Sequence, residues 1–89
     1  MAKIYRVDGG FELVEPANGT DFSLDEMKAI VGGYIEILPI GENLLMVCNE
    51  EGKLIGLPTN EIATLYALAN GILDCIAGDV LICDSNQIR

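Results

Sequence analysis

The feature that most constrains this chain is the stretch 44–60, with the sequence LLMVCNEEGKLIGLPTN. It contains two apolar runs of strand length, 44–48 and 54–57, with a short polar segment between them. Gly52 can take the positive φ that a short hairpin loop requires, and Pro58 ends the second run because proline cannot donate to a strand ladder. The stretch therefore predicts a β-hairpin in the middle of a sheet that is covered on at least one face.

The segments on both sides of this stretch predict further strands. Residues 3–7 and 11–15 are separated by Asp-Gly-Gly, which indicates a second hairpin. Residues 34–38 are rich in β-branched and aromatic side chains, and the loop from them to 44–48 is short enough to make the two strands antiparallel neighbours. A last strand is expected at 80–83, where it can pair with the central hairpin.

Two helices have clear start signals. Ser23 and Glu26 form a capping box for a helix over 24–31, which Gly-Gly ends. Asn60 is a suitable N-cap for a second helix over 61–69. This second helix is apolar on most sides, so it is either enclosed against the sheet or in contact with another copy of the chain. The predicted fold class is α+β, with a mainly antiparallel sheet of about five to six strands and two short helices packed on it.

The length of 89 residues predicts a single domain spanning 1–89, with 84–89 as a loose C-terminal tail. No apolar run approaches the roughly 18–20 residues that span a bilayer. The N-terminus, MAKIYRVDGG, has no hydrophobic segment behind its positive charges. We therefore expect a cytoplasmic protein that does not act at a membrane.

The charge balance argues against some partners. The chain has 14 acidic and 5 basic side chains and a net charge of −9, so it should repel nucleic-acid phosphates and anionic lipids. An acidic protein can instead imitate DNA and occupy a basic groove. Here the carboxylates are scattered over turns and helix starts, a pattern that is more typical of a solvated surface.

The residues that usually carry chemistry are few. Cys48, Cys75 and Cys83 are odd in number, lack Cys-x-x-Cys spacing and lie among aliphatic residues, which predicts buried, reduced thiols without a disulfide or metal role. The absence of histidine removes the commonest general base and the Cys-His and Ser-His pairs. We expect no enzyme activity, and we assign no catalytic, cofactor-binding or metal-binding residue.

The polar residues of the central stretch are the candidate interaction surface. They are Asn49, Glu50, Glu51, Lys53, Thr59 and Asn60. The alternative is a structural role, because a turn needs Asn and Gly, its tip is normally charged, and Thr-Asn can cap the helix that follows.

Three segments resemble the signature of domain-of-unknown-function family 3846. They are 30–36, 49–60 together with Ala63-Thr64, and 76–81, and the resemblance covers roughly residues 23–83. Members of this family are small proteins of bacteria, archaea, phages and mobile elements, and their occurrence beside antirestriction-type genes implies a role in counter-defence or host takeover.

We therefore expect a small acidic, non-enzymatic binding protein, a phage or mobile-element accessory factor that acts on a host or defence protein. The alternative is an oligomeric small-ligand binder, such as a sequestrant of nucleotide signals, with its pocket between subunits.

Overall fold

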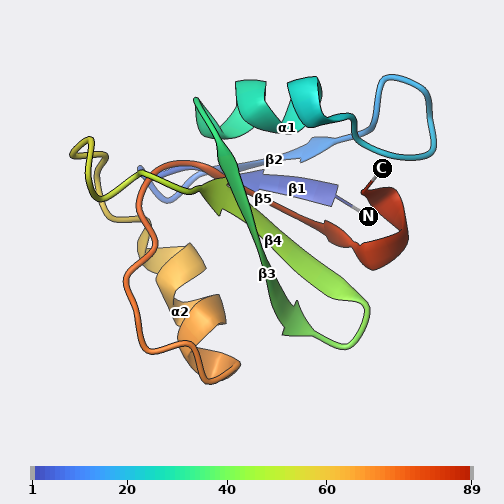
Figure 1. Ribbon diagram of the computed structural model, residues 1–89. Helices are drawn as coiled ribbons and strands as arrows, with labels where there is room; N and C mark the ends of the chain where they lie inside the picture. The colour runs from blue at the N-terminus through green and yellow to red at the C-terminus, as the bar shows by residue number, and fades with distance from the viewer. Residues whose placement is uncertain (1, 89) are drawn as a thin grey trace.

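The computed structural model describes residues 2–88 as an antiparallel sheet with one helix on each face (Figure 1). The five strands lie in the order β2-β1-β5-β4-β3. This arrangement confirms the predicted α+β class. The elements in chain order are β1 (Ala2–Tyr5), β2 (Phe11–Val14), α1 (Leu24–Val31), β3 (Ile35–Gly41), β4 (Leu44–Asn49), α2 (Glu61–Ala69), β5 (Val80–Asp84) and the 3-10 helix η1 (Ser85–Gln87).

The local signals in the sequence form as predicted. β1 and β2 are paired in a hairpin, and β3 and β4 are antiparallel neighbours. The Ser23 hydroxyl accepts a hydrogen bond from the Glu26 amide at 3.2 Å, while the Glu26 carboxylate accepts one from the Ser23 amide at 2.9 Å. Gly32 ends α1 with a φ of 81°, a left-handed conformation that glycine adopts without strain.

The sheet separates two hydrophobic cores, because successive side chains of a strand point to opposite faces. Val47 and Leu81 face α1, where they pack in one cluster with Met27 of that helix. Met46 and Val80 face α2 and belong to a second cluster. Figure 1 shows α1 and α2 on opposite sides of the strands. Both helices therefore pack on the sheet, as expected.

The predicted central hairpin is wrong in its second half. β4 is paired with β3 on one side and with β5 on the other, so neither of its edges is free. Residues 50–56 form consecutive turns instead of a strand, and the Ile55 amide donates to the Glu51 carbonyl at 3.0 Å. The side chain of Ile55 is 59% exposed instead of buried. The apolar pattern of 54–57 is that of a strand, but β5 from the far end of the sequence takes the pairing position.

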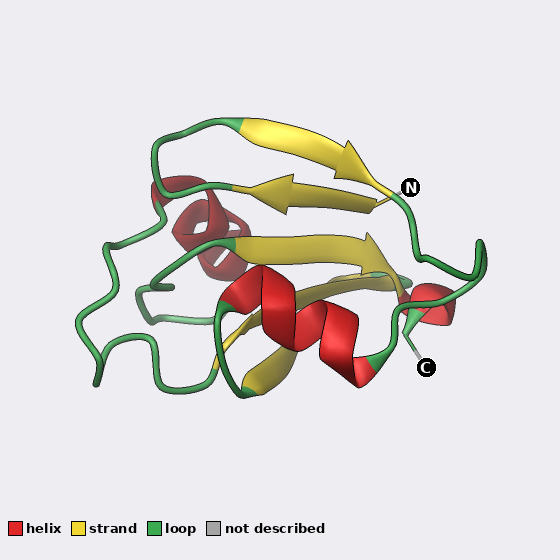
Figure 2. Cartoon of the chain, turned by 90° about the horizontal axis from the view of Figure 1, so that it is seen from above, coloured by secondary structure: helices red, strands yellow, loops and turns green. Residues whose placement is uncertain are grey.

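The C-terminal residues also differ from the expected loose tail. Asp84 ends β5, and η1 follows it directly. The Phe22 amide donates to the Gln87 carbonyl at 2.6 Å, and Ile88 packs against the core under α1. Figure 2 shows η1 next to the loop that leads into α1. These contacts hold 84–88 against the domain, whereas Arg89 lies outside the described residues.

No helix within residues 2–88 is both long enough and apolar enough to cross a membrane.

A candidate binding cleft beside strand β3

Asn49, the first residue of the predicted surface, has a structural role. It is buried, with 7% of its surface exposed. Its side-chain amide donates to the Val31 carbonyl at the end of α1 at 3.1 Å, and its side-chain oxygen accepts from the Glu51 amide at 2.8 Å. Asn49 therefore joins α1 to the turn after β4, and its two side-chain hydrogen bonds give it a structural role.

Asn60 has a similar role and is fully buried. Its side-chain oxygen caps α2 by accepting from the Ala63 amide at 3.1 Å, as predicted for an N-cap. Its side-chain nitrogen donates to the Tyr5 and Gly78 carbonyls, each at 3.0 Å. One side chain thus connects α2, β1 and the segment before β5. The structural interpretation is correct for both asparagines, so they are removed from the interaction surface.

The other four predicted residues are exposed, but they do not form one group. Glu50 and Lys53 line a cleft, whereas Glu51 and Thr59 do not line it. Thr59 forms an antiparallel bridge with Ala77.

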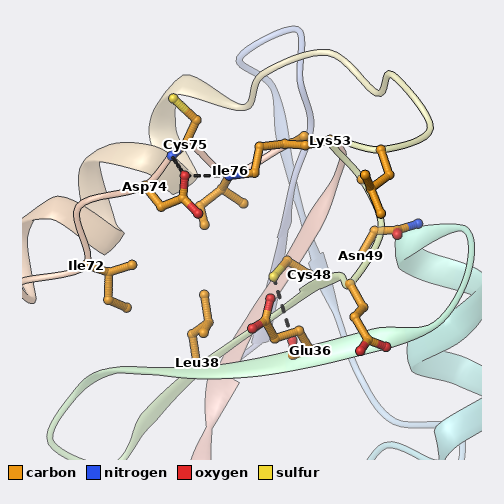
Figure 3. A pocket seen from close by; sticks show the side chains of 13 residues that line it. Glu36, Leu38, Cys48, Asn49, Lys53, Ile72, Asp74, Cys75 and Ile76 are labelled. Atoms are coloured by element: carbon orange, nitrogen blue, oxygen red, sulfur yellow. Dashed lines mark hydrogen bonds and ion pairs between the residues drawn. The ribbon is translucent and has the colours of Figure 1, made fainter.

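The cleft has a volume of about 280 Å³ and lies between β3, the turn at 50–54 and the segment 72–77. Figure 3 shows Glu36 and Leu38 of β3 on one side of it, and Ile72 and Asp74 on the other. The lining residues are Glu36, Leu38, Cys48, Asn49, Glu50, Gly52, Lys53, Leu54, Ile72, Asp74, Cys75, Ile76 and Ala77.

Close backbone contacts hold the two loop walls of the cleft together. A Cβ atom on Gly52 would lie 2.9 Å from the Ala77 carbonyl oxygen, so only glycine allows the turn to approach this closely. The Gly78 amide donates to the Pro58 carbonyl at 2.8 Å. The Asn60 amide donates to the Ile76 carbonyl at 2.7 Å. The cleft therefore has walls that the backbone fixes.

An exposed ion pair joins the two loops at the rim of the cleft. The Lys53 ammonium lies 2.5 Å from an Asp74 carboxylate oxygen. Hydrogen bonding to Lys53 holds the pKa of Asp74 below its ordinary value of 3.8, and the same bond raises the pKa of Lys53. Within the cleft, burial and the charge of Glu36 raise the pKa of the Cys48 thiol to about 11, so this side chain is neutral at pH 7.

Large apolar side chains are exposed around this cleft, and the sequence analysis did not identify them. Leu54 and Leu73 are each 85% exposed. Leu54 directly follows Lys53 of the ion pair, and Leu73 directly precedes Asp74. Leu65 and Leu68 are exposed on α2. The only sequence signal was that the second helix is apolar on most sides, which left two interpretations open.

Cys48 and Cys83 are buried, whereas Cys75 is exposed, so the prediction of a buried thiol is wrong for Cys75, whose aliphatic neighbours in the sequence do not enclose it. Within residues 2–88, no group of three or more His, Cys, Asp or Glu side chains is placed to hold a metal ion.

Comparison with known proteins identifies one family. A family model described as "Domain of unknown function (DUF3846)" matches residues 2–88. The match confirms the resemblance noted in three segments of the sequence and extends it to nearly the whole chain. No curated protein and no solved structure matches the chain.

Proposed function

Because this chain belongs to the DUF3846 family, whose description assigns no function, we propose from its surface that it is a small, acidic, non-enzymatic protein that acts by binding another protein. The observation that carries the proposal is the exposure of large apolar side chains around the cleft. Leu54 and Leu73 are both 85% exposed, and neither is needed to fill a core. Contiguous exposed apolar surface marks interaction sites in soluble proteins.

The apolar surface extends from the cleft onto α2. A shallow hollow lined by Leu68, Ile72 and Leu73 shares Ile72, Asp74 and Cys75 with the cleft. A second hollow lies along the same helix, and its lining residues are Ile62, Leu65, Tyr66 and Ala69. The cleft and the leucine-bearing side of α2 thus offer one surface on which a partner can bury apolar anchors.

The charge of the chain indicates what kind of partner it favours. A net charge of −9 attracts a basic protein surface and repels nucleic-acid phosphates, which is the preference expected from the sequence. If the chain works in a phage or mobile element, as the family resemblance implies, this partner is a host or defence protein.

Affinity capture with matched variants tests the proposal. The variant Leu54→Gln/Leu73→Gln replaces the two most exposed leucines beside the cleft, and Leu13→Gln replaces an exposed leucine on β2 at the far edge of the sheet. The wild-type chain and the Leu13→Gln variant should retain the same partner from a lysate of the organism that encodes the chain. The double variant should lose it while keeping its thermal stability, because exposed substitutions change stability by only about 0.5 kcal/mol.

A partner that binds the double variant as strongly as the wild type would overturn the assignment of this surface. Calorimetry with the purified partner should give at least a tenfold weaker Kd for the double variant and an unchanged Kd for Leu13→Gln. A partner lost equally by both variants would also contradict the proposal, because the effect would then not depend on the cleft.

A second candidate function is the binding of a small ligand, for which the cleft is the candidate site. Its volume of about 280 Å³ is just below the range of roughly 300–1,000 Å³ that small-molecule sites occupy. A nucleotide would bring its phosphates to a cleft lined by three carboxylates, so a sequestrant of nucleotide signals would need a pocket completed by a second subunit. Sizing in solution together with thermal shifts against a nucleotide panel tests this function, and a monomer without any shift would exclude it.

A further inference from the structure

Two carboxylates of the cleft, those of Glu36 and Glu50, come from β3 and from the residue directly after the neighbouring strand β4. Glu36 is the cross-strand partner of Cys48, and Glu50 follows two residues after Cys48. The Glu50 amide donates to the Tyr34 carbonyl at 2.9 Å, which continues the ladder beyond β4. Glu36 and Glu50 are therefore diagonal neighbours on one face of the sheet, where such pairs are about 7–8 Å apart. Both line the cleft.

The basic residue of the cleft forms its ion pair with Asp74, and its charge interaction with Glu36 is weaker. Lys53 is the one basic side chain that lines the cleft, and its ammonium is bound to Asp74 at the opposite wall. Within residues 2–88, neither Glu36 nor Glu50 forms an ion pair. Two like charges at this spacing repel each other, and a cation placed between them would remove that repulsion.

The rest of the cleft suits an aliphatic chain. Leu38, Ile72 and Ile76 form apolar walls, and the Cys48 thiol between the two carboxylates is uncharged at neutral pH. The volume of about 280 Å³ is small for a free metabolite but adequate for one long side chain. The exposed leucines at the rim would contact the residues on either side of that chain in a partner.

Building on the proposed function, we infer that the cleft binds an arginine side chain of the partner protein. Its aliphatic stem lies against Leu38 and Ile72, and its guanidinium group is shared by the carboxylates of Glu36 and Glu50. Arginine fits better than lysine because its planar group presents several N–H donors in fixed directions and is more weakly hydrated, so it can bond both carboxylates at once.

Titration of the ¹⁵N-labelled protein with short peptides tests the inference. The probes are acetyl-Leu-Arg-Leu-amide and acetyl-Leu-Gln-Leu-amide, which differ only in the charged group. The arginine peptide should shift the amide signals of cleft residues, including 36, 48 and 50, and should bind at least tenfold more tightly than the glutamine peptide. This ratio corresponds to the loss of a charge-assisted hydrogen bond. Equal binding of the two peptides, or shifts confined to the far edge of the sheet, would overturn the inference.

Charge-neutral variants give a second measurement, the preference for the arginine peptide, which would not change if the two carboxylates had only a structural role. Glu36→Gln/Glu50→Gln should weaken the arginine peptide about tenfold and abolish its advantage over the glutamine peptide. The same variant should leave the free protein at least as stable as the wild type, because it removes a repulsion. Glu15→Gln, on an exposed carboxylate outside the cleft, is the matched control and should change neither quantity. Unchanged preference in the double variant would contradict the assignment of these carboxylates.

Two further results separate the possible sources of the cation. Arginine amide, which lacks the flanking leucines, should bind more weakly than the tripeptide, and equally tight binding would point to a free small cation and overturn the partner assignment. If the peptides show no preference while Leu54→Gln/Leu73→Gln still loses the captured partner, the arginine inference fails and the proposed function stands. If neither effect occurs, both fail.

Discussion

The two faces of the sheet are covered by helices of similar length that pack in different ways. α1 buries Met27 and Val31, which are large, and presents its charged residues to solvent. α2 buries only the small residues Ala63 and Ala67, and its leucines point away from the sheet. The cleft is lined in part by the segment 72–77 that follows α2, and a shallow hollow that includes Leu68 of α2 adjoins it. A helix that contacts the sheet through small residues can thus cover the centre of a core while its large apolar side chains, and a hollow near it, stay exposed to solvent.

Thiol labelling should give the largest difference between the two faces. Cys83 is buried under α1, Cys48 is buried at the cleft, and Cys75 is exposed. With pKa values of about 11, roughly one in a thousand of the two buried thiols is ionised at pH 8. A maleimide reagent, followed by peptide mass spectrometry, should modify Cys75 at least about a thousandfold faster than Cys83, with Cys48 between them because local opening of the cleft suffices to expose it. Equal rates for Cys48 and Cys83 would show that the two faces open together.

Truncation of core side chains should distinguish the faces next. Leu81 is fully buried on the α1 side, so Leu81→Ala should lower the free energy of unfolding by about 3–5 kcal/mol, through lost transfer energy and a closed cavity. Ile76 borders the cleft, so Ile76→Ala should cost only about 2 kcal/mol, because the void it leaves opens to solvent. Urea unfolding measures both, and Leu73→Ala at an exposed position is the control. A larger loss for Ile76→Ala would mean that the α2 side is the better packed.

Removal of the Asn60 side chain tests the connection between α2 and the sheet. Asn60→Ala should destabilise the protein by about 2–4 kcal/mol, because it removes the cap of α2 and leaves the Tyr5 and Gly78 carbonyls without this donor. Asn86→Ala in η1, at an exposed residue, should change stability by less than about 0.5 kcal/mol. Similar values for the two variants would exclude a central role for Asn60.

The smallest effect is expected at the ion pair on the rim of the cleft. Because Lys53 lowers the pKa of Asp74, the pair stabilises the folded state above the ordinary value of 3.8, and this contribution is lost as the pH falls through the lower folded pKa. Asp74→Asn should therefore lower stability slightly at pH values above 3.8, and the variant and the wild type should converge as the pH falls below that value. The difference should vanish in 1 M NaCl, where the Debye length is about 3 Å. A large loss at pH 7 would show that the pair holds the two loops together.

Most local structure could be predicted because the signals act within a few residues. The capping box at Ser23, the N-cap at Asn60 and the alternation of 3–7 each specify an element through near neighbours. The prediction of a strand at 54–57 was wrong because an apolar run does not reveal which strand edge is available. β5 is remote in sequence and occupies that edge of β4.

The candidate site could be predicted only in part. Glu50 and Lys53 were recognised because a polar turn interrupts apolar runs, and both line the cleft. Asn49 and Asn60 were placed at the surface with them, since sequence cannot tell an asparagine that bonds buried backbone groups from one that faces a partner. Glu36, Ile72 and Asp74 were missed, because their neighbourhood depends on contacts between distant segments.

The amino-acid sequence by itself determined the α+β class, both helices with their caps, the charge of −9 and the membership of the DUF3846 family. These properties depend on composition and on interactions between residues close along the chain. Only the tertiary structure decided which strand lies beside β4, which side of α2 faces solvent and where carboxylates gather around a cleft. The physical reason is that strand pairing and helix orientation minimise the free energy of the whole assembly of segments, to which distant residues contribute as much as near ones.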